Sequence, residues 1–155
     1  MQDETLLPVS WRARPRSFVA LMSLYESNYI RLHALCGKVT ELTGAYRSIV
    51  SGDCDLILEV IERAPYTTTL SMTYLLPDAA TGSLERYPDV RIRVYADARL
   101  AEAQQWANHT GHPALRALGK TWLRDAEREL DQRWSQNMML NKWLDYCMER
   151  GHRFA

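Results

Sequence analysis

The sequence predicts an α+β fold: a single antiparallel sheet of four to five strands, covered by an N-terminal helix and a long C-terminal helix. Helix-like spacing of apolar residues appears near both ends of the chain, and strand-like alternation fills the middle. The strand-like segments are joined by connections of hairpin length, which favours antiparallel pairing. Helices that flank such a meander bury their apolar sides on one face of the sheet.

The first helix is predicted to begin at Phe18. Ser17 is a suitable N-cap, because its hydroxyl can accept a hydrogen bond from an early backbone N–H. Gly37 supplies the C-terminal stop. Alternating steps of four and three residues place six side chains on one apolar stripe: Phe18, Met22, Tyr25, Tyr29, Leu32 and Cys36. Leu21, Asn28 and Leu35 widen this stripe on one side.

The middle of the chain contains several segments with the composition or alternation of strands. These segments are residues 46–50, 55–63, 67–75 and 90–96, and residues 100–106 suit either a strand or a helix. Residues 77–88 contain proline, glycine and serine and are expected to form a loop. The clearest alternation is in 90–96, where valine and isoleucine should face the helices and arginine and tyrosine should point away.

A long helix is predicted near the C-terminal end, over residues 125–150. Its apolar stripe consists of Leu130, Leu140, Leu144, Cys147 and Met148. Arg133 and Asn137 fall within the stripe, and Trp134 and Trp143 flank it. Tryptophans beside the stripe indicate more apolar surface than one sheet can cover. We therefore expect a homodimer or a partner protein to contact this helix.

The expected domain organisation is simple. Residues 1–16 contain two prolines and three arginines without periodicity, so we expect a flexible N-terminal arm. Residues 17–155 have the length of one ordinary domain, which can bury a sizeable core. No internal repeat or low-complexity tract divides this region.

The composition predicts a cytoplasmic protein that contacts no membrane. The 19 Lys and Arg residues balance the 19 Asp and Glu residues, so the chain lacks the basic excess typical of nucleic-acid binding. Cys36, Cys54 and Cys147 form no Cys-x-x-Cys pair and are expected to be buried, reduced thiols. No apolar run has the length of a membrane helix, and the acidic start of the sequence lacks the features of a secretory signal.

Several short strings in the sequence point to a known family. They are Glu26-x-Asn28-Tyr29-x-x-Leu32, Arg63-x-x-Tyr66-Thr67-Thr68, Arg93-x-Tyr95-x-Asp97-Ala98-x-x-Ala101-Glu102, and Asn137 followed by Trp143-Leu144-x-Tyr146-Cys147-x-x-x-Gly151. In this order and spacing the chain resembles, from Phe18 to Gly151, the YqiB-like family of small cytosolic proteobacterial proteins, a domain of unknown function. That family usually has a histidine before the aspartate matched by Asp97, where this chain has Ala96. The resemblance implies no activity.

No strong catalytic motif is present, which favours a protein without enzymatic activity and without a cofactor. Phosphate-binding loops, dinucleotide-binding glycine motifs and the common hydrolase and zinc motifs are missing from the sequence. His109 and His112 could bind a metal if His33 or His152 supplied a third ligand. The remaining ligands would have to come from scattered positions. We therefore favour two solvent-exposed loop histidines over a metal site.

Asn28 and Asn137 are the polar residues expected to be buried, because each lies within the apolar stripe of its helix. A buried amide without partners costs about 1–3 kcal/mol, so each side chain needs hydrogen bonds. One interpretation is that the asparagines tie the helices to the sheet or to each other. The other is that they line a pocket between helix and sheet.

The outer face of the sheet is the candidate surface for a ligand or a partner. It consists of Arg63, Tyr66, Arg93, Tyr95 and Asp97. Arginine offers a planar fork of donors for anions, and tyrosine offers an amphipathic ring for protein contacts. The alternative is a solvated face whose arginines pair with Glu59 and Glu62 across strands.

These observations lead to two hypotheses for the function. The first is a binding or regulatory module that acts through protein contacts or a small anionic ligand. The second is a small enzyme with a site between the sheet and the C-terminal helix, around Asp97, Arg93 and Asn137. A deep pocket that converges on Asp97 would favour the enzyme, and a shallow arginine- and tyrosine-lined surface would favour the module.

Overall fold

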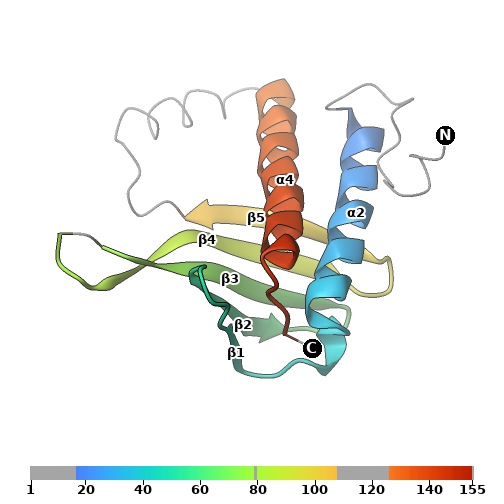
Figure 1. The fold of residues 1–155 in the computed structure, drawn as a ribbon. Coiled ribbons are helices and arrows are strands. Elements are labelled where there is room, and N and C mark those ends of the chain that lie inside the picture. The colour runs from blue at the N-terminus through green and yellow to red at the C-terminus, as the bar shows by residue number, and fades with distance from the viewer. Residues whose placement is uncertain (1–16, 79, 108–125, 155) are drawn as a thin grey trace.

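The computed structural model describes residues 17–78, 80–107 and 126–154. Within them, five strands form one antiparallel sheet in the order β1-β2-β3-β4-β5, and two long helices lie on one face of it (Figure 1). The elements are α2 (Phe18–Cys36), the 3-10 helix η1 (Val39–Glu41), β1 (Ala45–Ser48), β2 (Asp55–Arg63), β3 (Thr67–Pro77), β4 (Leu84–Tyr95), β5 (Leu100–Ala107) and α4 (Ala126–Glu149). The predicted α+β fold is confirmed.

Helix α2 begins and ends at the predicted capping residues. The Ser17 hydroxyl accepts a hydrogen bond from the Ala20 N–H at 3.2 Å, and Gly37 has a positive φ of 72°. The buried side of the helix includes Leu21, Leu24, Asn28, Leu32 and Leu35. Phe18, the first residue of the predicted stripe, is instead 65% exposed. The first turns of α2 extend past the edge of the sheet (Figure 1).

The strands differ from the prediction mainly near the β3–β4 hairpin. The ambiguous segment after β4 is strand β5. The loop predicted at 77–88 is wrong in its second half, because residues 84–88 belong to β4. The register between β3 and β4 shifts between Thr73 and Leu75, which leaves Pro88 in a bulge of β4. A bulge tolerates proline because its residues need no N–H for the ladder.

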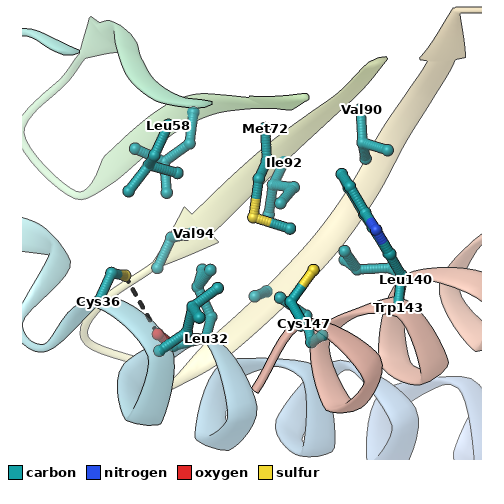
Figure 2. Close-up of a cluster of buried hydrophobic side chains, with 14 of the residues drawn as sticks. Leu32, Cys36, Leu58, Met72, Val90, Ile92, Val94, Leu140, Trp143 and Cys147 are labelled. Carbon is teal, nitrogen blue, oxygen red and sulfur yellow. Dashed lines mark hydrogen bonds between the residues drawn. The ribbon is translucent and has the colours of Figure 1, made fainter. Parts of the chain in front are cut away.

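The main core fills the space between the helices and the inner face of the sheet. Val90, Ile92 and Val94 of β4 are fully buried and face the helices, as predicted. Leu58 and Met72 of the same sheet belong to this core, and the helices contribute Leu32, Cys36, Leu140 and Cys147 (Figure 2). Trp143 also belongs to this core. Its ring contacts the edge of the Tyr74 ring, with the centroids 5.4 Å apart.

A second, smaller core lies between the two helices. Leu21, Leu24 and Tyr25 of α2 are buried there, and Leu130 and Trp134 of α4 pack against them. Both helices run in the same direction, and their N-terminal halves extend together past β5 (Figure 1). In this region the helices stabilise each other, since apolar side chains on one helix replace the sheet as the packing surface for the other.

Between the two cores, buried asparagines join the helices to the free edge of β5. The Asn137 Oδ1 accepts hydrogen bonds from the Ala103 N–H at 2.7 Å and from the Asn28 amide at 3.1 Å. The Asn28 amide also donates to the carbonyl of Ala101 at 3.3 Å, and Asn141 donates to the Asn28 Oδ1 at 3.0 Å. An edge strand exposes a row of unpaired backbone groups. The asparagines bind these groups in place of a sixth strand.

The sequence also predicts reduced cysteines, no membrane helix and an N-terminal arm. Cys36, Cys54 and Cys147 are free thiols; the first and last are buried, and burial raises the pKa of each of these two to about 12. None of the helices in the described residues is long and apolar enough to cross a membrane. The predicted arm at 1–16 lies outside the described residues.

Replacing Asn137 should show how much the edge contact stabilises the fold. Asn137→Leu leaves the Ala103 N–H without its partner, so we expect the free energy of unfolding to fall by about 1–3 kcal/mol. Chemical denaturation measures this difference. Gln104→Ala, at an exposed position of the same strand, is the control and should change the value by less than about 0.5 kcal/mol. In the double variant with Asn28→Leu the two losses should be less than additive, because both changes remove the hydrogen bond between Asn28 and Asn137. Full additivity would contradict this arrangement.

Candidate functional site

One end of the sheet brings together α2, η1 and the β4–β5 turn around a pocket, the sheet-end pocket. Its volume is about 760 Å³. Its lining residues are Glu26, Tyr29, Ile30 and His33 from α2, Lys38, Val39 and Thr40 from the η1 segment, and Ala96 and Arg99 from the turn. A pocket of this volume can hold a small molecule.

Helix α2 supplies one wall of the sheet-end pocket. Glu26, Tyr29 and His33 are spaced by three and four positions, which places them on the same side of the helix. The rings of Tyr29 and His33 stack with their centroids 6.2 Å apart. A regular helix thus presents a carboxylate, a phenol and an imidazole to the pocket in fixed relative positions.

Arg63 fixes a second wall by binding the backbone around η1. Its guanidinium donates hydrogen bonds to the carbonyls of Leu42 and Val39 and to the Thr68 hydroxyl, the last at 3.0 Å. A guanidinium can bind several backbone carbonyls at once through its fork of donors. Arg63, predicted to lie on the ligand surface, therefore supports the segment that carries Lys38.

The β4–β5 turn holds Arg99 in an unusual backbone conformation. Its φ is 56°, a positive value that no other non-glycine residue has in the described part of the chain. The Arg99 N–H donates to the Ala96 carbonyl at 3.3 Å and closes the turn. The left-handed conformation costs a residue with a Cβ roughly 1–2 kcal/mol, and glycine is the usual occupant. A strained residue at the wall of a pocket is a candidate functional residue.

Positive charge predominates around the sheet-end pocket. Arg99 and Lys38 are cations, His33 becomes one when protonated, and Glu26 is the acidic residue of the lining. Lys38 also lies 3.9 Å from Glu41, but the two side chains are 69% and 72% exposed, and such ion pairs are weak. The pocket is therefore suited to an anion.

The other residues of the predicted surface do not gather on one face. Tyr66 is 72% exposed in the β2–β3 turn, and Asp97 is exposed in the β4–β5 turn. The Tyr95 hydroxyl donates to Glu102 at 2.6 Å. Burial and this carboxylate raise the pKa of Tyr95, although a hydrogen bond from Arg93 acts in the opposite direction. Tyr95 is therefore hydrogen-bonded to β5, and Arg93 lies beside Tyr95 on β4.

The residues of the enzyme hypothesis have separate surroundings. Asn137 is buried between the helices, where its amide binds Asn28 and the Ala103 N–H. Arg93 is on the opposite face of β4 from the buried valines, and Asp97 is in the turn. The structure therefore provides no pocket in which these three side chains converge among the described residues.

The histidines of the metal hypothesis also lie apart. His33 lines the sheet-end pocket, and His152 is completely buried near the C-terminal end of the described chain. His109 and His112 lie outside the described residues. Within the described ranges, no group of three or more His, Cys, Asp or Glu side chains is placed to hold a metal ion.

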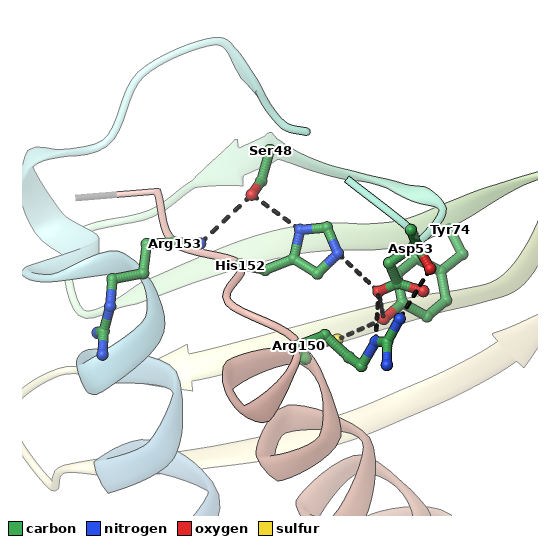
Figure 3. A network of polar contacts seen from close by, with 8 residues as sticks. Ser48, Asp53, Tyr74, Arg150, His152 and Arg153 are labelled. Atoms are coloured by element: carbon green, nitrogen blue, oxygen red, sulfur yellow. Dashed lines mark hydrogen bonds and ion pairs between the residues drawn. The ribbon is translucent and has the colours of Figure 1, made fainter. Parts of the chain in front are cut away.

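A polar cluster around His152 has the composition of a catalytic triad. The His152 Nδ1 lies 2.8 Å from the Ser48 Oγ, and its Nε2 lies 2.9 Å from an oxygen of Asp53 (Figure 3). Tyr74 donates to the same oxygen at 3.0 Å, and the Arg150 Nε is 3.9 Å from it. A catalytic serine must reach its substrate, but Ser48 is only 7% exposed and His152 is fully buried. The cluster instead fastens the residues after α4 to β1 and to the β1–β2 turn.

Asp53 carries the negative charge of this cluster. Burial alone would raise its pKa, but hydrogen bonds from the Cys54 N–H, from His152 and from Tyr74 outweigh this effect. The net pKa of Asp53 is therefore lower than the ordinary value for an aspartate.

The lowered pKa of Asp53 predicts a loss of stability in acid. Its ionised form stabilises the fold above the unfolded-state pKa of about 4, and this contribution is lost as the pH falls through the lower folded-state pKa. Asp53→Asn should therefore unfold more easily than wild type near neutral pH, and the difference should narrow below about pH 4. Urea denaturation across this pH range measures it. Ser48→Ala keeps the Asp53 carboxylate, so its deficit should not follow the titration of an aspartate near pH 4. A pH-independent deficit in Asp53→Asn would contradict the assignment.

The sequence does not single out Lys38 or Arg99. A signal for Arg99 exists, because only residues 96–99 separate β4 from β5. Short hairpin loops built on a type I turn commonly end in a left-handed residue, and glycine is expected there. Lys38 has no comparable signal, since its position depends on the contact between Arg63 and the η1 backbone.

Comparison with known proteins places the chain in a family. A family model described as "Protein of unknown function (DUF1249)" matches residues 31–153. No curated protein and no solved structure matches the chain. The matched range contains the η1 segment, all five strands, the described part of α4 and the His152 cluster. Because the match covers well over half of the sequence, the chain belongs to the DUF1249 family, whose function is unknown.

Proposed function

We propose that the protein is a non-catalytic binding module that holds a small anion in the sheet-end pocket. The observation that carries this proposal is the strained backbone of Arg99, whose side chain lines the pocket together with Lys38 and His33. A turn with glycine at this position would be less strained. The arginine therefore contributes something other than stability, and a guanidinium that lines a cationic pocket is suited to binding an anion.

A ligand with a phosphate or carboxylate group fits the chemistry of the lining. The Arg99 guanidinium can hold two oxygens of such a group through its planar fork, and Lys38 adds a compact positive charge. The Thr40 hydroxyl and the Tyr29 ring line the same pocket and can contact the rest of the ligand. Glu26 repels anions of high charge, which favours a small molecule with a single anionic group.

The alternative of a small enzyme around Asp97, Arg93 and Asn137 has less support. The Asn137 amide is used to bind β5 and α2, so it cannot also orient a substrate. The narrower YqiB-like resemblance and the cytoplasmic location remain predictions.

The predicted contact through the last helix also remains a prediction. Trp134 and Trp143, which motivated it, pack in the two cores. Helix α4 does expose Met139 and Tyr146, at 54% and 47%. These side chains are the ones that a homodimer or a partner protein would cover.

Titration with inorganic phosphate tests the proposed anion site. We expect phosphate to shift the NMR signals of the His33 ring in a saturable way at constant ionic strength. Arg99→Gly should weaken this binding by about tenfold or more, since a hydrogen bond to a charged group contributes roughly 1.5–3 kcal/mol. The same variant should unfold no more easily than wild type and should gain up to about 1 kcal/mol, because glycine relieves the strain.

The control for this titration is Arg91→Gln. Arg91 is an exposed arginine on the same strand as Arg93 and lies outside the sheet-end pocket, so its replacement should leave phosphate affinity unchanged. Equal losses in both variants would show a general charge effect and would contradict the proposal. An Arg99→Gly variant that binds phosphate normally but unfolds more easily would identify Arg99 as a structural residue.

A further inference from the structure

The N-terminal halves of the two helices extend past β5 (Figure 1). Residues of these helices and of the β4–β5 region line a second pocket. Its volume is about 570 Å³. Phe18 and Met22 of α2, Leu100 of β5 and Leu130 of α4 form most of its apolar wall. Phe18 is 65% exposed, so a large aromatic surface faces solvent at this pocket. We call it the interhelix pocket, and it shares no lining residue with the sheet-end pocket.

The polar side chains of the interhelix pocket lie close to one another. The Tyr95 hydroxyl donates to Glu102 at 2.6 Å. Tyr25 lies near Glu102 and Arg133, and it is 5% exposed. Burial and the Glu102 charge raise the pKa of Tyr25 to about 12, although Arg133 acts in the opposite direction. Both phenols are thus available as donors to the Glu102 carboxylate at neutral pH.

Exposure decides which charge the pocket presents to a ligand. The Glu102 carboxylate is partly buried and accepts a hydrogen bond from the Tyr95 hydroxyl. Arg133 is an exposed cation of the lining. A head group that enters from solvent therefore meets the charge of Arg133, which attracts a carboxylate and repels a cation.

We propose that the interhelix pocket binds an amphipathic monoanion, a carboxylate on an apolar chain. The chain lies against Phe18, Met22 and Leu100, and the guanidinium of Arg133 holds the head group. Apolar walls with a few convergent polar groups are typical of small-molecule sites. This site goes beyond the proposed function, because it is a separate pocket that shares no lining residue with the sheet-end pocket.

Calorimetric titration of the full chain with decanoate, below its micelle concentration, tests this site. We expect saturable binding of one decanoate per chain. Decanol, with the same apolar chain and no charge, should bind about tenfold more weakly, and decyltrimethylammonium should not bind, because neither can form a charged hydrogen bond with Arg133. Arg133→Gln should weaken the binding of decanoate by a similar factor and leave the binding of decanol unchanged. Lys142→Gln removes another exposed cation of α4 and is the control, with unchanged affinity for both.

A filling variant tests the location of the site independently of charge. Met22→Trp should abolish binding of both decanoate and decanol while leaving the thermal midpoint near the wild-type value. In wild type, decanoate should shift the Met22 methyl signal in NMR spectra, and excess phosphate should not displace it. The proposal is overturned if decanoate does not bind, if Arg133→Gln binds it as tightly as wild type does, if the cationic amphiphile binds equally well, or if the Met22 methyl does not respond. Should Met22→Trp fail to fold, Arg133→Gln and the methyl signal decide the question.

Discussion

The free edge of β5 has backbone groups that need hydrogen-bond partners. Two asparagines, one on each helix, provide these hydrogen bonds, and the positions of both helices depend on them. Asn28 and Asn137 bind the Ala101 carbonyl and the Ala103 N–H, and they bind each other. Because a buried amide is costly unless it is hydrogen-bonded, the helices have one favourable height and rotation relative to the strand. Arg31 extends the same contact toward solvent through its ion pair with Asp145 at 2.9 Å. This arrangement explains why each helix is divided into a half that packs on the sheet and a half that packs on the other helix.

The same division accounts for the two pockets. The helical halves beyond β5 meet no sheet, so the space between them and the end of the strand forms the interhelix pocket. On the other side of the β4–β5 turn, α2 and η1 enclose the sheet-end pocket. The turn contributes Ala98 to the first pocket and Ala96 and Arg99 to the second. The two pockets therefore share one short backbone segment but no side chain, and a change in the conformation of that segment alters both.

Periodicity in the sequence predicts the fold class, the extent of α2 and the inner face of β4, because burial on a regular element repeats at a fixed spacing. It does not predict that Phe18 is exposed, since the spacing of a helix says nothing about where the sheet ends. Periodicity is limited in the same way for the outer face of the sheet. Alternation assigns Arg93 and Tyr95 to that face, but the hydrogen bond from Tyr95 to Glu102 depends on the pairing of β4 with β5. The roles of Arg63 and Arg99 follow from turn geometry, which local sequence patterns describe least well.

The contact between α2 and α4 joins parts of the chain that are synthesised far apart in time. Asn28 and Asn137 are 109 residues apart, and the whole meander lies between them. Contacts of such long range form late, after the cost of ordering the intervening chain has been met. While the ribosome is still adding the residues of α4, the edge of β5 and the apolar side of α2 lack their partners. A bare strand edge is a template for pairing with another chain, so the nascent protein is most exposed to aggregation until α4 has emerged.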